Sequence, residues 1–424
     1  MKRVTLCVFS GLIMVSLLMF TPLIGSARAG STKGEEMTLL IHSSTFAKFS
    51  RDIAPAFEKE TGIKVNIVEV PFGNLQPKFM LSLATGKREY DVISMTNAMM
   101  YGASIYLEDL EELFTPDVVK DFPQPTIDSS MDLQGIKRGF PFINSLVALY
   151  YRTDLFQERG LQPPKTWDEF LSVCKKCTIE SSPVGKIWGT LIEASSKAVQ
   201  PGVKLVSWFL QAGGGLYDEN ENPTVDRKQN IEALQFVGDL VNKYKVAPPA
   251  ASEMIYEDVH NMFIQGRGAT AINWQYMVSL ANAPDSVVKG KFAVVPVPKG
   301  KKHGVEMDCW LWAIPTISEH KEAAKTWIRY ATTREAQFEL LKGEGLVARF
   351  SAMNVNDPRV LEINPFIKAW VDSLFQFAVP IPKWKQIEEA RMRLSAAKCS
   401  AVTQVKSPAQ ALKDAQKEIE ELLR

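Results

Sequence analysis

A repeated alternation of strand-like and helix-like segments near the start of the chain restricts its fold more than any other sequence feature. In the strand-like segments apolar residues are consecutive or alternate with polar ones, whereas in the segments between them they recur on one face. Gly62 and Gly86 follow the two helix-like segments, and glycine commonly ends a helix. Such an alternation builds a parallel sheet with helices packed on its faces. We expect strands at residues 37–41, 63–67 and 91–95, a helix capped by Ser50 and ending at Gly62, and a helix at residues 75–85.

The ends of these strands are the first candidates for a binding site. Ligands of open α/β sheets bind beyond the carboxyl ends of the strands. Here those ends are residues 42–45, 71–74 and 96–97, where polar and aromatic side chains follow the apolar segments. The candidate ligand-binding residues at these ends are His42, Ser44, Phe72, Asn74 and Asn97.

The first 29 residues predict an exported protein. Lys2 and Arg3 precede an almost wholly apolar stretch, residues 4–24, and Ala27-Arg28-Ala29 has the small-residue pattern at which signal peptides are cleaved. The apolar stretch is long for a signal peptide, so an uncleaved membrane anchor is the alternative. No Cys stands at the cleavage site to carry a lipid anchor. We expect residues 1–29 to be removed as a signal peptide and the protein to be periplasmic.

Length and charge narrow what the exported part can be. The chain has 49 basic and 48 acidic residues, and removal of Lys2, Arg3 and Arg28 with the leader leaves a net charge of −2. A nearly neutral chain has no electrostatic basis for binding nucleic acid or an anionic membrane surface. The remaining length of about 395 residues exceeds one ordinary core, so two domains are expected.

The motifs of several enzyme and cofactor classes are missing from the sequence. It contains no phosphate-binding loop, dinucleotide fingerprint or serine-nucleophile elbow, and its four histidines are scattered rather than paired at metal-ligand spacing. We therefore expect no enzyme activity, metal or cofactor. Spacing does not reveal the two facing carboxylates of a glycosidase, so an exported carbohydrate-active enzyme is the alternative.

Cys174 and Cys177 form a C-x-x-C pair, which is also found in redox proteins. Both lie inside the helix that the capping box of Thr166 and Glu169 predicts. A reactive pair normally begins a helix, where the helix dipole lowers the thiol pKa. We expect these cysteines to be buried packing residues or a local disulfide rather than a redox centre.

Four segments, in order along the chain, resemble one known family. They read LYYRTDLF at 149–156 and GLQPPKTWDEF at 160–170, then FIQGRGATAINW at 263–274 and WAIP at 312–315. This pattern is similar to that of the maltose-binding-like extracellular solute-binding proteins of ABC importers. One departure is Asp308-Cys309-Trp310, which stands where the family often has a pair of glycines.

The resemblance implies a type II periplasmic-binding-protein fold, in which two α/β lobes, each with a mainly parallel sheet flanked by helices, close around a cleft. Lobe one would comprise residues 37–143 plus 297–345, and lobe two residues 144–296 plus 346–424. Asn144 and Ser145, at the first crossing between the lobes, are hinge candidates. The implied function is non-catalytic: a monomer binds a carbohydrate and delivers it to the inner-membrane ABC permease subunits.

A carbohydrate presents apolar C–H faces and a rim of hydroxyls, so its site needs aromatic faces together with carboxylate, amide or guanidinium groups. Trp274 is the leading aromatic candidate, although packing in the core would also explain it. Trp310 and Trp312 share one strand face by their spacing, so one is expected in the core and the other at its rim. A polyamine, phosphate ester or metal chelate is the alternative ligand. The further candidates are Tyr276, Trp310 and Trp384 among the aromatic residues, and Asn144, Glu306, Asp308 and Arg349 among the polar ones.

Overall fold

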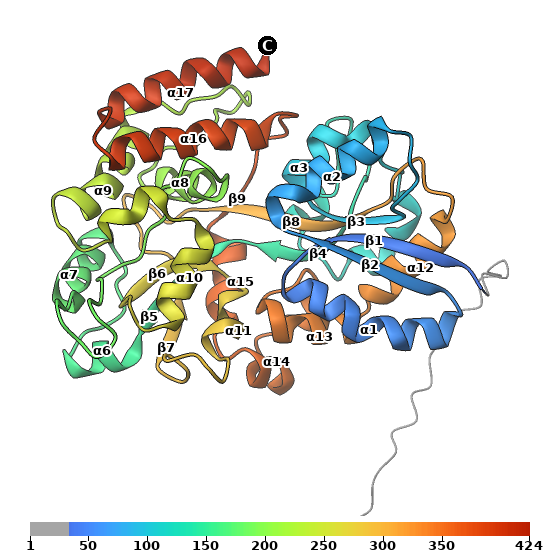
Figure 1. The fold of residues 1–424 in the computed structure, drawn as a ribbon, viewed down its shortest axis with the longest axis horizontal. Coiled ribbons are helices and arrows are strands. Elements are labelled where there is room, and N and C mark those ends of the chain that lie inside the picture. The colour runs from blue at the N-terminus through green and yellow to red at the C-terminus, as the bar shows by residue number, and fades with distance from the viewer. Residues whose placement is uncertain (1–33) are drawn as a thin grey trace, which may run out of the picture.

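The structure is a computed structural model that describes residues 34–424. Its helices and strands form two groups that lie side by side, each built around one sheet (Figure 1). The predicted signal peptide, residues 1–29, lies outside the described residues. None of the helices within residues 34–424 is long and apolar enough to cross a membrane.

The larger sheet has the strand order β2-β1-β3-β8-β4, with β9 paired to β8. Strands β1 and β2, and strands β1 and β3, pair in parallel, as the alternating sequence pattern predicts. Strand β8 comes from much later in the chain and runs antiparallel to both β3 and β4. The strands of this sheet are β1 (Glu36–His42), β2 (Lys64–Val70), β3 (Val92–Thr96), β4 (Phe140–Ser145), β8 (Val305–Ala313) and β9 (Ala378–Pro380).

The first helix, α1 (Thr45–Thr61), begins five residues before the predicted cap at Ser50. Its buried face already starts at Phe46, and Ser50 is itself buried inside the helix. The Ser50 hydroxyl donates a hydrogen bond to the Phe46 carbonyl, so it bonds within the helix instead of capping it. The predicted end is confirmed, because Gly62 adopts the left-handed conformation with φ 76°.

The smaller sheet has the order β6-β5-β7, with strands β5 (Val147–Arg152), β6 (Thr270–Trp274) and β7 (Phe292–Val295). Its pairings are antiparallel rather than the expected parallel ones. The register shows the opposite directions of the two strands, because Val147 at the start of β5 lies opposite Trp274 at the end of β6. Strand β5 therefore leaves the junction between the lobes, whereas β6 ends there.

A single residue, Leu146, separates β4 from β5, so the chain passes directly from the larger sheet to the smaller one. Asn144 at this crossing is fully buried; its Oδ1 accepts a hydrogen bond from the Thr126 hydroxyl, and its Nδ2 donates to the carbonyl of Val347. The crossing is thus tied to a segment two hundred residues later in the sequence. The residue boundaries of the lobes stay predictions.

The remaining helices surround the two sheets (Figure 1). The capping box that predicts a helix after Thr166 is confirmed at the start of α7. In chain order these helices are α2 (Phe72–Ala84), α3 (Asn97–Ala103), α4 (Pro116–Val119), α5 (Gln124–Asp128), α6 (Thr153–Glu158), α7 (Trp167–Cys177), α8 (Gln200–Gln211), α9 (Lys228–Asn242), α10 (Tyr256–Ile264), α11 (Met277–Ala281), α12 (Lys321–Ala331), α13 (Arg334–Glu344), α14 (Pro358–Ile363), α15 (Ile367–Gln376), α16 (Ile387–Val402) and α17 (Pro408–Leu423).

The cysteines of α7 belong to the hydrophobic core. Cys174 and Cys177 are both fully buried and carry free thiols. Burial raises the pKa of the Cys174 thiol well above its usual range and that of Cys177 to about 11. A redox centre needs the opposite shift, because the thiolate is its nucleophile. The packing interpretation is therefore favoured over both the local disulfide and the redox pair.

Candidate functional site

One cavity of about 650 Å³ opens between the two groups of elements. On the side of the larger sheet it is lined by the ends of β1 and β3, the starts of α1 and α2, and part of β8. On the opposite side it is lined by α8, α10, α16 and the end of β6. Its volume lies within the range of about 300–1,000 Å³ that is typical of small-molecule sites.

An aromatic cluster forms the wall on the larger-sheet side. The ring of Trp310 stacks on His42 with centroids 5.7 Å apart and an interplanar angle of 9°. Phe46 and Phe72 contact the same indole, with ring centroids 4.8 and 5.8 Å from it. Trp312, two residues further along β8, is fully buried and stacks on Phe142. The period-two prediction is confirmed: one tryptophan faces the cavity and the other lies in the core.

A second aromatic group lies on the opposite wall. Trp274, at the end of β6, meets the ring of Tyr256 edge to face at 5.9 Å. Tyr276 follows in the next turn and lies 6.2 Å from Tyr256, and its hydroxyl is 3.0 Å from Nδ1 of His260. The cavity therefore has aromatic side chains on both walls, supplied by segments far apart in sequence.

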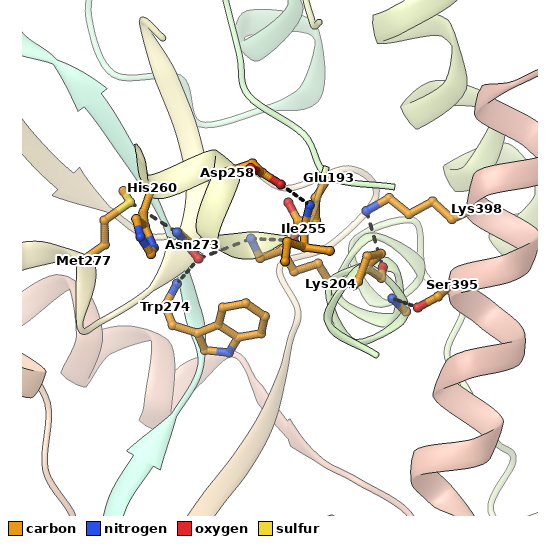
Figure 2. Close-up of polar contacts among 12 residues, drawn as sticks. Glu193, Lys204, Ile255, Asp258, His260, Asn273, Trp274, Met277, Ser395 and Lys398 are labelled. Atoms are coloured by element: carbon orange, nitrogen blue, oxygen red, sulfur yellow. Dashed lines mark hydrogen bonds and ion pairs between the residues drawn. The ribbon is translucent and has the colours of Figure 1, made fainter. Parts of the chain in front are cut away.

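A buried polar network supports Trp274 from within the second lobe (Figure 2). The ammonium of Lys204 forms an ion pair with Glu193 at 2.6 Å and lies 4.7 Å from the centroid of the Trp274 ring. It also donates to the side-chain oxygen of Asn273, which in turn accepts the backbone N–H of Trp274. Because both the ring and the backbone are held, the orientation of this indole is restricted before any ligand arrives.

Arg391 of α16 brings three carboxylates together across the junction. Its Nη2 donates to Oδ1 of Asp308 at 2.9 Å and lies 3.1 Å from Oε1 of Glu306, and its Nη1 donates to Glu388 at 3.2 Å. Burial raises the pKa of Glu306 to about 8 and that of Glu388 to about 7, against the opposing effect of the guanidinium. Three carboxyl groups share one guanidinium. Its single positive charge therefore does not fully offset the effect of burial on the pKa values of Glu306 and Glu388.

Two other carboxyl groups line the cavity without a cation. Glu344, at the end of α13, accepts a hydrogen bond from the Thr45 hydroxyl, and burial raises its pKa to about 8. Glu257 of α10 has a raised pKa for the same reason, and its Oε2 is buried without a hydrogen-bond partner. Within residues 34–424 neither carboxyl group forms an ion pair. Gln275, 2% exposed between Trp274 and Tyr276, likewise has an unpartnered Oε1.

The two histidines of the cavity are neutral at pH 7. Burial lowers the pKa of His42 to about 4, and it lowers that of His260 to about 4 as well. Both rings therefore act as aromatic surfaces and hydrogen-bonding groups rather than as cations. No cluster of side chains that could hold a metal ion occurs among the described residues.

The structure brings seven of the predicted site residues into the cavity lining and places an eighth beside it. Glu306 lies directly behind the lining, where it contacts Arg391. The residues that line the cavity are His42, Ser44, Phe72, Trp274, Tyr276, Asp308 and Trp310.

Five predicted residues lie elsewhere, and four of them use their polar groups in other contacts. Asn74 is exposed on α2, and Asn97 is buried and accepts the backbone N–H of Cys309. Asn144 is bonded within the crossing, as described above. Arg349 is paired with Asp121, and Trp384 is buried with its N–H donated to the carbonyl of Glu221.

Sequence reasoning missed the residues that helices supply. Tyr256, Glu257 and His260 come from α10, and Glu388 and Arg391 come from α16. A rule that searches strand ends does not reach them, because these side chains come from helices. Gln275 could have been found, because it lies between two predicted site residues.

Two α/β lobes, joined by crossing segments and enclosing a cavity lined from both sides, define the two-lobe periplasmic-binding fold of type II. Residues 42–338 match the model of the bacterial extracellular solute-binding protein family, and the chain belongs to that family. These proteins capture solutes outside the cytoplasm for ABC transporters.

Named relatives extend over most of the chain. A probable amino-acid ABC transporter periplasmic-binding protein of Sinorhizobium fredii is 23% identical over 402 residues, covering 92% of this chain and 90% of its own. The arabinooligosaccharide-binding protein of Bacillus subtilis is 24% identical and covers 79% of this chain and 77% of its own. The structure of maltose-bound MalE3 from T. maritima superimposes with a TM-score of 0.83 at 25% identity, covering 92% of this chain and all of that one (100%).

Proposed function

We propose that the protein captures a carbohydrate, either a mono- or oligosaccharide or a sugar alcohol, in the cavity between its lobes and delivers it to inner-membrane ABC permease subunits. The single observation that carries the proposal is the lining of the cavity. Trp310 and Trp274 offer aromatic surfaces on opposite walls, and the carboxylate of Asp308 in the same lining offers a hydrogen-bond acceptor. Aromatic surfaces match the C–H faces of a sugar, and planar acceptors match its hydroxyls.

Two of the named relatives support this ligand class, since one is an arabinooligosaccharide-binding protein and the other was solved with maltose. A third is named as a probable amino-acid-binding component, so an amino acid is the second candidate ligand. The two candidates differ in what they require. An α-amino acid needs a cation for its carboxylate, yet the guanidinium of Arg391 is already shared by three carboxylates.

The test is a thermal-shift and tryptophan-fluorescence screen of the purified protein. Mono-, di- and trisaccharides and sugar alcohols are compared with amino acids, polyamines and phosphate esters. Stabilisation by a carbohydrate supports the proposal, and stabilisation by an amino acid alone would replace it with the second candidate.

We further propose that the protein is a monomer without catalytic activity and that it resides in the periplasm after removal of residues 1–29. Intact mass spectrometry of the exported protein should give a chain that begins at Gly30. Incubation with aryl glycosides should release no aglycone, and steady release would instead support the carbohydrate-active enzyme.

A further inference from the structure

The cavity holds more acidic than basic side chains. Four acidic side chains line it: Glu257, Asp308, Glu344 and Glu388. The basic residues of the lining are Arg391 and Lys48. Lys48 is exposed and paired with Asp52 at 2.5 Å, so its charge is largely compensated. The guanidinium is therefore the one buried cation in the lining, and it is the only buried group there that could pair with an anionic ligand.

That guanidinium is already engaged. Glu306, Asp308 and Glu388 all lie within 3.2 Å of Arg391, so three carboxylates share its single positive charge. The Nε of this guanidinium has no hydrogen-bond partner among the described residues. Lys204, a buried ammonium on the same side of the cavity as α10, is paired with Glu193 at 2.6 Å (Figure 2). Within residues 34–424 neither Glu257 nor Glu344 forms an ion pair, although the charge of Glu257 acts on the pKa of Lys204 from beyond contact distance.

These two carboxyl groups come from opposite walls of the same cavity. Glu344 belongs to α13 on the larger-sheet side, where it is 3% exposed, and Glu257 belongs to α10 on the other side. A buried carboxylate is unfavourable unless it is paired and hydrogen-bonded. Gln275 adds an unpartnered acceptor, Oε1, in the same lining.

A ligand that complements these acceptors would carry a positive charge and several hydrogen-bond donors. A protonated amine has three donors and no acceptor, which matches unpartnered carboxylate and amide oxygens. Its approach to the aromatic walls is favourable as well, because the faces of Trp and Tyr attract cations. Burial raises the pKa of Glu344 to about 8, so its carboxyl is largely protonated in the empty cavity at pH 7. A hydroxyl can satisfy one acceptor but does not stabilise the ionised carboxylate, whereas a nearby positive charge does.

We propose that the cavity selects a carbohydrate that carries a protonated amine, such as an amino sugar or an amino alditol, with Glu257 and Glu344 binding the ammonium group. This inference rests on the proposed function and narrows it to a cationic member of the class. In this arrangement the aromatic walls contact the carbon skeleton of the ligand, and the carboxyl groups of Glu257 and Glu344 bind its ammonium group.

The experiment compares matched ligands by calorimetry at pH 7 and low salt. The probes are D-glucosamine, D-glucose and D-glucuronate, the alditol series D-glucamine, D-glucitol and D-gluconate, and a set of neutral and amine-bearing disaccharides. We expect the amine of a series to bind at least tenfold more tightly than its neutral counterpart, and the acid not to bind.

A neutral sugar that binds as tightly as its amine counterpart would overturn the inference and leave the proposed function standing. Binding of spermidine without binding of any carbohydrate would overturn the proposed function, and the inference with it, since the selected cation would then not be a sugar. Absence of binding by every probe would also overturn both.

Charge-removing variants test the two residues directly. Glu257→Gln and Glu344→Gln keep the size of each side chain and should weaken amine binding at least tenfold, while binding of a neutral sugar stays the same or improves. Glu339→Gln is the matched control, because Glu339 lies on the same helix but is exposed and paired with Lys342. Equal loss of amine and neutral binding in the two variants would contradict the assignment.

Discussion

Trp310 and Trp312 show how far sequence reasoning reaches at the scale of single residues. Their spacing along β8 predicts a shared face, and the structure places the first against His42 and the second against Phe142. The ion-pair cluster of Arg391 is different, because its partner Asp308 is 83 residues away on another element. No local pattern relates those two positions, so only the folded chain reveals that they meet.

Replacing Trp274 with Ala should weaken binding of the physiological carbohydrate. The loss of the aromatic surface is worth about 1–3 kcal/mol, or roughly a five- to hundredfold lower affinity. Titration calorimetry measures the change. Trp188→Ala is the control, since that indole lies outside the cavity beneath the ammonium of Lys186. An unchanged affinity in Trp274→Ala would show that the ligand lies against Trp310 alone.

Glu344 should make the folded state less stable as the pH rises. Its pKa is raised to about 8 in the folded state, whereas an unfolded Glu titrates near 4.3. Between those values the folded state binds more protons than the unfolded state, so the free energy of unfolding falls with increasing pH. Glu344→Gln should remove this dependence, which we estimate at roughly 2–4 kcal/mol.

The measurement is urea unfolding of both proteins from pH 5 to pH 9 without ligand. Taking the difference between the two proteins cancels the other titrating groups of the cavity. A constant difference across this range would show that Glu344 titrates normally.

At the scale of elements, most predicted strands and helices of the first hundred residues are confirmed, because Gly and period-two patterns mark their limits. The smaller sheet is where the prediction is wrong. Its antiparallel pairing follows from the direction in which β5 leaves the crossing, which is a property of chain path rather than of composition.

The packing of α8 against α16 depends on a glycine. A Cβ at Gly202 would lie 2.1 Å from the carbonyl oxygen of Arg391, a backbone atom that cannot move aside alone. Gly202→Ala should therefore destabilise the protein by about 1–3 kcal/mol and displace Arg391 from the cavity wall. Denaturant unfolding and ligand affinity are both expected to change.

Gly238→Ala in α9 is the matched control for that substitution. A Cβ there would meet the carbonyl of Ala401 at 3.7 Å, which is ordinary contact. The added helix propensity should leave stability unchanged or raise it by up to about 1 kcal/mol. Equal effects of the two substitutions would exclude close helix packing as the cause.

At the scale of the whole molecule, the cavity has one wall on each lobe, so a ligand gains all its contacts only when the lobes are together. Ligand should therefore shift an existing open–closed equilibrium toward the closed form. Small-angle scattering should show a smaller radius of gyration with saturating ligand. An identical radius with and without ligand would contradict closure.

The position of β8 also has a consequence for how the chain folds. Residues 305–313 lie between β3 and β4 in the larger sheet, although more than 150 residues separate them from either neighbour. Until that late segment is available, β3 and β4 each keep an unpaired edge, which is a surface prone to intermolecular association. Contacts of such long sequence separation slow folding. The larger sheet therefore cannot be completed until about three-quarters of the chain has been synthesised. Until then the nascent chain must be kept from associating with other chains through its unpaired strand edges.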